Sequence, residues 1–256
     1  MSIVTFLSDV HLGAHSPPVE AAKERDLVAL LDRLEPGSTL YLLGDVFDFW
    51  FDHAEPPRRH GPVLRALQRA RARSVAILFM GGNHDYWVRA ERGPGWLERE
   101  LGIAVLDDPH LTRHDGVSLL LTHGDALGGA TGGYRWVRSV LRNPAAIFAF
   151  RLLPARAGHW LADRTSAGSR GRHTDADLAR YRDRLRSAAA CELTRGEVDA
   201  VVAGHVHTPE RSELGGGVYL NLGDWTVHRT YGRLKDGRLT IERFDGPPAD
   251  VGGLEP

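Results

Sequence analysis

The stretch that decides the fold is residues 3–11, which read IVTFLSDVH. A largely apolar run, Ile3–Leu7, is followed almost at once by two side chains that can bind a metal ion, Asp9 and His11. The run lacks the polar alternation of a half-exposed strand, which is typical of a strand buried on both faces. We therefore predict a central strand with polar chemistry at its carboxyl end.

Four later strand-like runs end in the same way. They are Thr39–Leu43 before Asp45, Val75–Met80 before Asn83, His84 and Asp85, Val117–Leu121 before His123, and Val198–Val202 before His205 and His207. Helical patterns at Val19–Leu34 and Pro62–Arg73 separate the first three runs, an order that predicts an α/β fold. Because the carboxyl ends of strands in an open α/β sheet lie along one edge, we expect the five loops to converge there.

Seven side chains in these loops are candidate metal ligands: Asp9, His11, Asp45, Asn83, His123, His205 and His207. Taken singly, each motif is readily explained as a turn or a helix cap. That explanation does not account for ligand-capable residues after all five strands. Seven ligands are too many for one ion and suit two divalent ions that share a carboxylate, an arrangement that hydrolyses phosphoesters. Manganese is the expected metal, with iron or zinc as alternatives.

The ordered set Asp-x-His, Gly-Asp, Gly-Asn-His-Asp, His-Gly-Asp and Gly-His-x-His resembles the calcineurin-like metallophosphoesterase superfamily. The resemblance implies a four-layer α/β/β/α sandwich formed by a single domain over residues 1–256. It implies one metal at Asp9, His11, Asp45 and His207, and a second at Asp45, Asn83, His123 and His205. It also implies that His84 contacts the phosphate and protonates the leaving oxygen, with Asp85 orienting its ring as the second catalytic residue.

Within the superfamily, the stretch LGDVFDFW at residues 43–50 and a helical insertion after Asp125 resemble the UDP-2,3-diacylglucosamine hydrolases of lipid A synthesis. That resemblance implies cleavage of a sugar-nucleotide pyrophosphate to UMP and 2,3-diacylglucosamine 1-phosphate. Residues 128–187 would form an inserted helical cap that holds the acyl chains. Asn83, His84, Tyr134 and Arg135 are expected to bind the substrate. The alternative is a phosphoesterase that acts on soluble nucleotides, phosphodiesters or phosphoproteins.

The expected cap differs in charge from the rest of the chain. Residues 128–187 contain twelve arginines, four aspartates and no lysine or glutamate, a net charge of +8. Since the whole chain carries −1, the remainder carries −9. Two explanations stay open: an ordinary helical hairpin packed on the sandwich, or a basic amphipathic surface that contacts an anionic membrane.

The composition excludes several other classes of protein. The 256 residues have the apolar and charged content of an ordinary globular chain, and a net charge of −1 argues against a nucleic-acid binder. The single cysteine, Cys191, cannot form an internal disulfide, and no apolar run is long enough to span a membrane. We expect a cytoplasmic protein with peripheral contact at the inner face of the cell membrane. No sequence feature indicates its oligomeric state.

Overall fold

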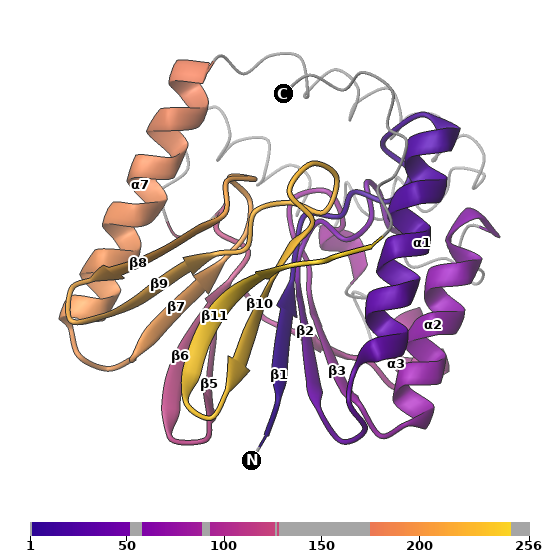
Figure 1. Ribbon diagram of the computed structural model, residues 1–256, viewed down its shortest axis with the longest axis horizontal. Coiled ribbons are helices and arrows are strands. Elements are labelled where there is room, and N and C mark those ends of the chain that lie inside the picture. Colours follow the sequence, from indigo (N-terminus) through magenta and orange to yellow (C-terminus); the bar gives the residue numbers. More distant parts are fainter. Residues whose placement is uncertain (1, 52–57, 89–92, 126, 128–174, 247–256) are drawn as a thin grey trace.

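The computed structural model describes residues 2–51, 58–88, 93–125, 127 and 175–246. Within these ranges the chain forms two β-sheets packed face to face, with helices on both outer sides (Figure 1). This arrangement confirms the predicted four-layer α/β/β/α sandwich.

The first sheet has six strands in the order β11-β10-β1-β2-β3-β4. Strands β1 to β4 run parallel to one another, whereas β10 is antiparallel to both β1 and β11. The strands are β1 (Val4–Leu7), β2 (Thr39–Leu43), β3 (Ala76–Met80), β4 (Ala104–Leu106), β10 (Thr230–Lys235) and β11 (Arg238–Arg243). The strand expected from residues 3–11 thus lies inside the sheet, between β2 and β10.

The second sheet has five strands in the order β5-β6-β7-β9-β8. Its three inner strands are parallel, and each edge strand is antiparallel to its neighbour. The strands are β5 (His110–His114), β6 (Val117–Thr122), β7 (Ala200–Ala203), β8 (Glu210–Leu214) and β9 (Gly217–Asn221).

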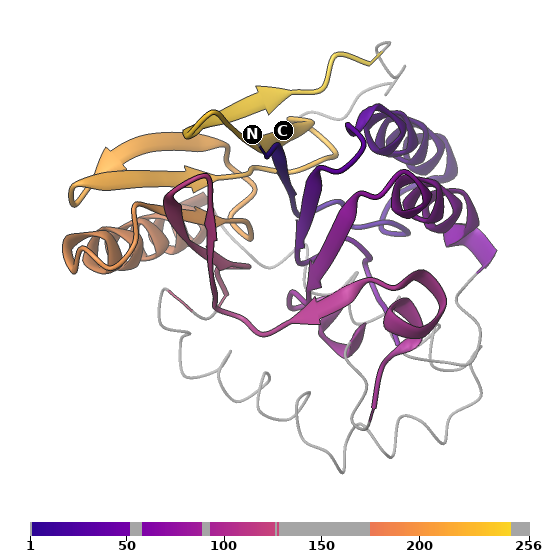
Figure 2. The same ribbon diagram turned by 90° about the horizontal axis from the view of Figure 1, so that it is seen from below.

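The helices cover the outer faces of the two sheets, as Figure 2 shows from below. Helices α1 (Pro17–Arg33), α2 (Gly61–Ala72) and α3 (Trp96–Leu101) pack on the first sheet, and α7 (Asp175–Thr194) packs on the second. Two short 3₁₀ helices, Arg58–His60 and Tyr86–Val88, lie in the loops of the first half. Among the helices that the structure describes, none has both the length and the apolar content needed to span a bilayer.

The central strands are apolar throughout because each face of a sheet meets a different core. In β2, Leu40 and Leu42 pack toward α1 and α2, while Tyr41 and Leu43 pack between the two sheets. Burial on both faces is the reason for the unbroken apolar runs in the sequence.

Helix α7 overlaps the end of the expected cap. The expected boundary at residue 187 falls inside this helix, and Leu185, Ala189 and Leu193 are all buried against the second sheet. The end of the insertion therefore continues into a layer of the sandwich. Residues 128–174, the main part of the expected cap, lie outside the described residues.

Candidate metal centre

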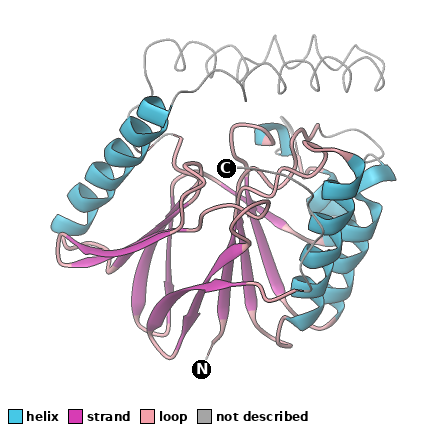
Figure 3. Ribbon diagram, turned by 45° about the horizontal axis from the view of Figure 1, so that its top comes forward, coloured by secondary structure: helices cyan, strands magenta, loops and turns pink. Residues whose placement is uncertain are grey.

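The candidate ligands lie in loops at the carboxyl ends of β1, β2, β3, β6 and β7. Figure 3 shows the loops at this edge gathered between α7 and α1. The loops after β1 and β2 continue the pairing of their strands, because Asp9 N–H donates to Gly44 O at 3.1 Å and His11 N–H donates to Asp45 O at 2.9 Å. This extended pairing holds the Asp9 and Asp45 segments side by side.

Five of the seven candidate ligands have a left-handed backbone. Their φ angles are 53° at Asp9, 48° at His11, 53° at Asp45, 73° at His205 and 54° at His207. Residues with side chains adopt this conformation rarely, and where they do it tends to mark functional sites. The loop hydrogen bonds hold this strained backbone, so the side chains of these candidate ligands are preorganised in the absence of a metal ion.

The two oxygens of the Asp45 carboxylate have different partners. Oδ1 accepts a hydrogen bond from the His84 backbone N–H at 2.8 Å. Oδ2 lies 3.7 Å from His11 Nε2 and 3.5 Å from His123 Nε2, which belong to loops of the two different sheets. A carboxylate oxygen between two imidazoles is in the position that a ligand shared by two ions requires.

Asp9, His11 and His207 form a cluster on one side of Asp45. Oδ1 of Asp9 lies 3.2 Å from Nε2 of His207, and Nε2 of His207 lies 3.2 Å from Nε2 of His11. Asp9 is fully buried, and among the described residues the rings of His207 and His11 face its Oδ1. Burial acts against a proton on His207, but Asp9 raises the pKa of that ring above its ordinary value. A buried carboxylate of this kind needs a cation beside it, either a protonated imidazole or a metal ion.

His123, Asn83 and His205 lie on the other side of Asp45. His123 Nδ1–H donates to Leu43 O at 3.0 Å, and Nε2 lies 3.0 Å from Oδ1 of Asn83. The ring of His205 lies 5.1 Å from that of His123, and its backbone N–H donates to Oδ2 of Asp9 at 2.9 Å. The hydrogen bond at Nδ1 fixes the tautomer of His123 and leaves Nε2 as its ligand atom.

Two glycines make room for the carboxylates. A Cβ at Gly82 would lie 2.2 Å from Asp45 Oδ1, and a Cβ at Gly204 would lie 2.4 Å from Asp9 Oδ2. No side chain fits at either position without displacing a candidate ligand. The buried carboxylates, their glycine cradles and the imidazole nitrogens together fit divalent metal ions.

The charges of these groups depend on one another. Burial alone would raise the pKa of Asp45, but His123 and His84 hold it well below its ordinary value. Burial lowers the pKa of His11 to about 3 and that of His205 to about 4, so both rings are neutral, as metal ligation requires. Burial acts against a proton on His123, but Asp45 raises the pKa of that ring well above its ordinary value. A cation that binds His123 therefore displaces a proton.

His84 lies beside this cluster, and its partner differs from the one expected. Its ring packs edge-on against His11 with 4.8 Å between centroids. Its Nδ1 lies 3.2 Å from the carbonyl oxygen of Asp48 and 3.4 Å from Asp48 Oδ1. Burial alone would lower the pKa of His84, but Asp45 and the hydrogen bond to Asp48 raise it to about 9. Among the described residues, the His84 ring thus contacts Asp48, whereas the Asp85 carboxylate makes its hydrogen bonds elsewhere.

Asp85 instead holds the backbone of the site together. Oδ1 accepts hydrogen bonds from the N–H groups of Asp45 at 3.0 Å and Gly82 at 2.8 Å. Oδ2 accepts from Val46 at 2.8 Å and Phe47 at 3.1 Å. Among the described residues, this buried carboxylate thus hydrogen-bonds to backbone N–H groups, because the turn after β3 directs it toward the β2 loop and away from the His84 ring.

The sequence motifs do not predict a role for Asp48. The available signal was a second aspartate in the same loop, three residues after Asp45. Two predicted substrate-binding residues, Tyr134 and Arg135, lie outside the described residues.

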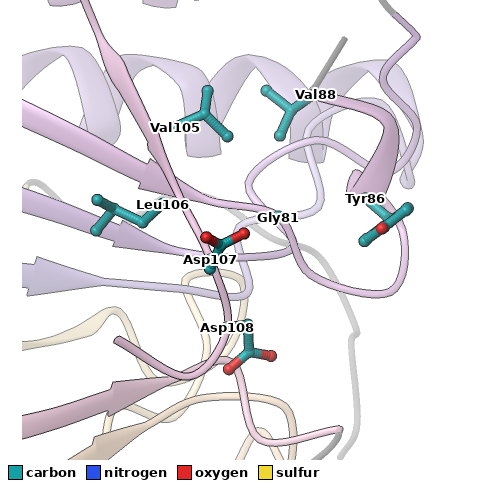
Figure 4. Close-up of a pocket in the computed structure, with 7 residues that line it drawn as sticks. All are labelled: Gly81, Tyr86, Val88, Val105, Leu106, Asp107 and Asp108. Carbon is teal, nitrogen blue, oxygen red and sulfur yellow. The ribbon is translucent and has the colours of Figure 1, made fainter. Parts of the chain in front are cut away.

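A cavity of about 100 Å³ lies next to the β3 loop, beside Gly81 (Figure 4). Asp107 and Asp108 line it from the segment after β4, and Tyr86 and Val88 line it from the turn that follows His84 and Asp85. None of the seven candidate ligands lines this cavity.

Comparison with known proteins finds a matching family model, similar proteins and similar solved structures. The family model for calcineurin-like phosphoesterases matches residues 3–209. A UDP-2,3-diacylglucosamine hydrolase from Pseudomonas fluorescens is 28% identical, with 96% of this chain and 97% of that protein covered. A protein of the same name from Pseudomonas putida is 30% identical, with 83% and 85% covered. Among solved structures, Vps29 from Chaetomium thermophilum aligns with 94% of this chain and 87% of that chain, at 12% identity and a TM-score of 0.45.

Proposed function

The chain belongs to the calcineurin-like phosphoesterase family, a family of metal-dependent hydrolases, and from this we propose that it cleaves the pyrophosphate of UDP-2,3-diacylglucosamine. The products are UMP and 2,3-diacylglucosamine 1-phosphate. The observation that carries the hydrolytic part is the position of Asp45 Oδ2 between His11 and His123. The relatives named UDP-2,3-diacylglucosamine hydrolase support the choice of substrate.

Two divalent ions are proposed to bind at this edge. Asp9, His11 and His207 would hold one, Asn83, His123 and His205 would hold the other, and Asp45 would be shared. When bound, such ions supply Lewis acidity toward a phosphoryl group and lower the pKa of water at the site. The mixture of imidazole, carboxylate and amide donors suits manganese, with iron or zinc as alternatives.

His84 is proposed to give a proton to the leaving oxygen. The Asp48 carbonyl oxygen holds Nδ1, which leaves Nε2 as the nitrogen that transfers the proton. His84 and Asn83 would also contact the phosphate. Asp85 acts on the chemistry indirectly, because its four backbone hydrogen bonds hold Asp45 and Gly82 in place.

The acylated end of the substrate is proposed to lie against the insertion, with Tyr134 and Arg135 near the phosphates. In the described part of the insertion, Arg180, Arg182 and Arg184 of α7 are all exposed. Tyr181 of the same helix lies 6.4 Å from the His205 ring, so α7 reaches the metal edge. An exposed arginine-rich helix next to the site supports contact with an anionic membrane at the inner face of the cell membrane.

The test compares two substrates on the same purified, manganese-loaded protein. We expect release of UMP and the acylated sugar phosphate from UDP-2,3-diacylglucosamine, and slower hydrolysis of an aryl phosphodiester. A variant with a Gly/Ser linker in place of residues 128–174, which leaves α7 intact, should keep the aryl phosphodiesterase activity and lose the acylated substrate. Turnover of soluble nucleotides without turnover of the acylated substrate would instead favour the alternative function.

A further inference from the structure

Lys23 is a buried lysine on α1 that lies behind the loop carrying Asp9 and His11. It is 3% exposed. Its Nζ donates hydrogen bonds to the carbonyl oxygens of Val10 at 2.9 Å and His11 at 2.7 Å. Lys23 therefore anchors the backbone of His11, a candidate ligand, to helix α1.

Glu20, one helical turn earlier, contacts both Lys23 and the same loop through its carboxylate. Its Oε1 lies 2.9 Å from Nζ of Lys23 and accepts the backbone N–H of His15 at 2.8 Å. Its Oε2 accepts the backbone N–H of Gly13 at 2.8 Å. The ion pair thus connects helix α1 to the loop at four backbone positions, from Val10 to His15.

Trp225, in the segment after β9, also hydrogen-bonds to this part of the structure. Its backbone N–H donates to the carbonyl oxygen of Asp9 at 3.1 Å, and its indole Nε1–H donates to the carbonyl oxygen of Lys23 at 3.3 Å. Carbonyl groups at Asp9, Val10 and His11 are therefore all taken by Lys23 or Trp225. Two of these three residues have the left-handed backbone that aims their side chains.

The choice of lysine at this position departs from the rest of the chain. Of the 32 basic residues, only Lys23 and Lys235 are lysines. An ammonium group is compact and has three donors, and here it lies against two carbonyl oxygens, Oε1 of Glu20 and, at 3.1 Å, Nδ1 of His15. A planar guanidinium of greater length does not reproduce this convergence, so charge alone does not explain the residue.

We propose that Lys23 is a positioning residue for the ion at Asp9, His11 and His207, and that it sets the affinity for that ion by fixing the backbone of His11. The inference rests on the proposed function only in that a divalent cation binds at these side chains. Partners one step behind a metal ligand commonly change metal affinity when they are removed, by about 10–100-fold.

The test measures manganese binding to the metal-free protein by calorimetry, alongside its unfolding in urea. Lys23→Met should weaken one of the two binding steps about 10–100-fold. This should be the step that His11→Ala weakens, and the step that His123→Ala weakens should stay near the wild-type value. In the same step, Lys23→Arg should bind manganese as weakly as Lys23→Met does. Lys235→Met, at an exposed lysine of β10, should bind as the wild type does.

The outcomes separate the proposal from a structural role and from the proposed function. Equal affinity in folded Lys23→Met and wild type, even with a lower unfolding midpoint, overturns the proposal, as does full restoration by Lys23→Arg. If Lys23→Met does not fold, Glu20→Gln decides, because a weakened step supports the proposal and an unchanged one overturns it. Two-step binding by wild type without hydrolysis of UDP-2,3-diacylglucosamine would refute the proposed function and leave the role of Lys23 standing.

Discussion

Replacing Asp85 by asparagine changes one atom and should cost a large part of the stability of the protein. The Asp85 carboxylate accepts four hydrogen bonds from buried backbone N–H groups, two at each oxygen. An asparagine has one acceptor oxygen, so whichever way its amide is turned, its NH₂ group faces two donors. Each buried donor left unsatisfied costs about 1–3 kcal/mol, which gives a loss of about 2–6 kcal/mol. Globular proteins have a total stability of about 5–15 kcal/mol.

The assay is urea unfolding of the metal-free protein, followed by circular dichroism. With an m-value of about 3 kcal/mol/M, the midpoint should fall by about 0.7–2 M. Asp115→Asn is the matched control, because that exposed carboxylate accepts a hydrogen bond from the backbone of Ser2 and its change should stay within about 0.5 kcal/mol. An Asp85→Asn midpoint as close to wild type as that of the control would refute the anchoring role of Asp85.

Three further predictions follow from the contacts around the site. Gly82→Ala should reduce the metal content measured by elemental analysis, because its Cβ would lie 2.2 Å from Asp45 Oδ1, and retention of wild-type metal content would contradict the cradle. Asp48→Asn should lower kcat for an aryl phosphodiester about 10–100-fold with metal content unchanged, because it removes the carboxylate charge 3.4 Å from His84 Nδ1 and leaves the backbone carbonyl in place; an unchanged kcat would remove the Asp48 carboxylate from the mechanism. Burial alone would raise the pKa of Glu20, but His15 and Lys23 lower it to about 2 in the folded protein. The ionised Glu20 carboxylate therefore stabilises the fold fully at pH values above its ordinary pKa of 4.5, and this stabilisation is lost as the pH falls toward 2. Urea unfolding should therefore show Glu20→Gln closer to wild type at pH 2.5 than at pH 6, and a constant difference would contradict the shift.

The layered fold could be predicted because the central strands are apolar on both faces. Such runs are visible in the sequence, and each ends where polar side chains begin. The elements that escaped prediction lack this signal: β4 is only three residues long, and β5 is a mostly polar edge strand in which half-buried and exposed side chains alternate and Leu111 is 64% exposed. Short and half-exposed strands depend on their neighbours for pairing, which a local pattern does not reveal.

The candidate ligands could be named from sequence because each follows a strand whose end is fixed. The roles of Asp85, Asp48 and Lys23 could not, because they depend on the direction of a side chain after a turn. Asp85 follows His84 directly, yet three of the four N–H groups that donate to it belong to residues about 40 positions earlier. Likewise, nothing near Lys23 in the sequence indicates that its ammonium reaches the His11 carbonyl.

The distance along the chain between the two halves of the site governs when it can first exist during synthesis. His11 and His207 are 196 residues apart, yet their Nε2 atoms lie 3.2 Å from each other. At about 5–20 residues per second, a ribosome needs about 10–40 s to make the segment between them. The pairing of strand β1 is complete only later, because its antiparallel neighbour β10 begins at Thr230. Until residue 207 is made, Asp9 and His11 lack their partner from the second sheet, so a nascent chain stalled before that residue should not retain the ion that we propose to bind at His11.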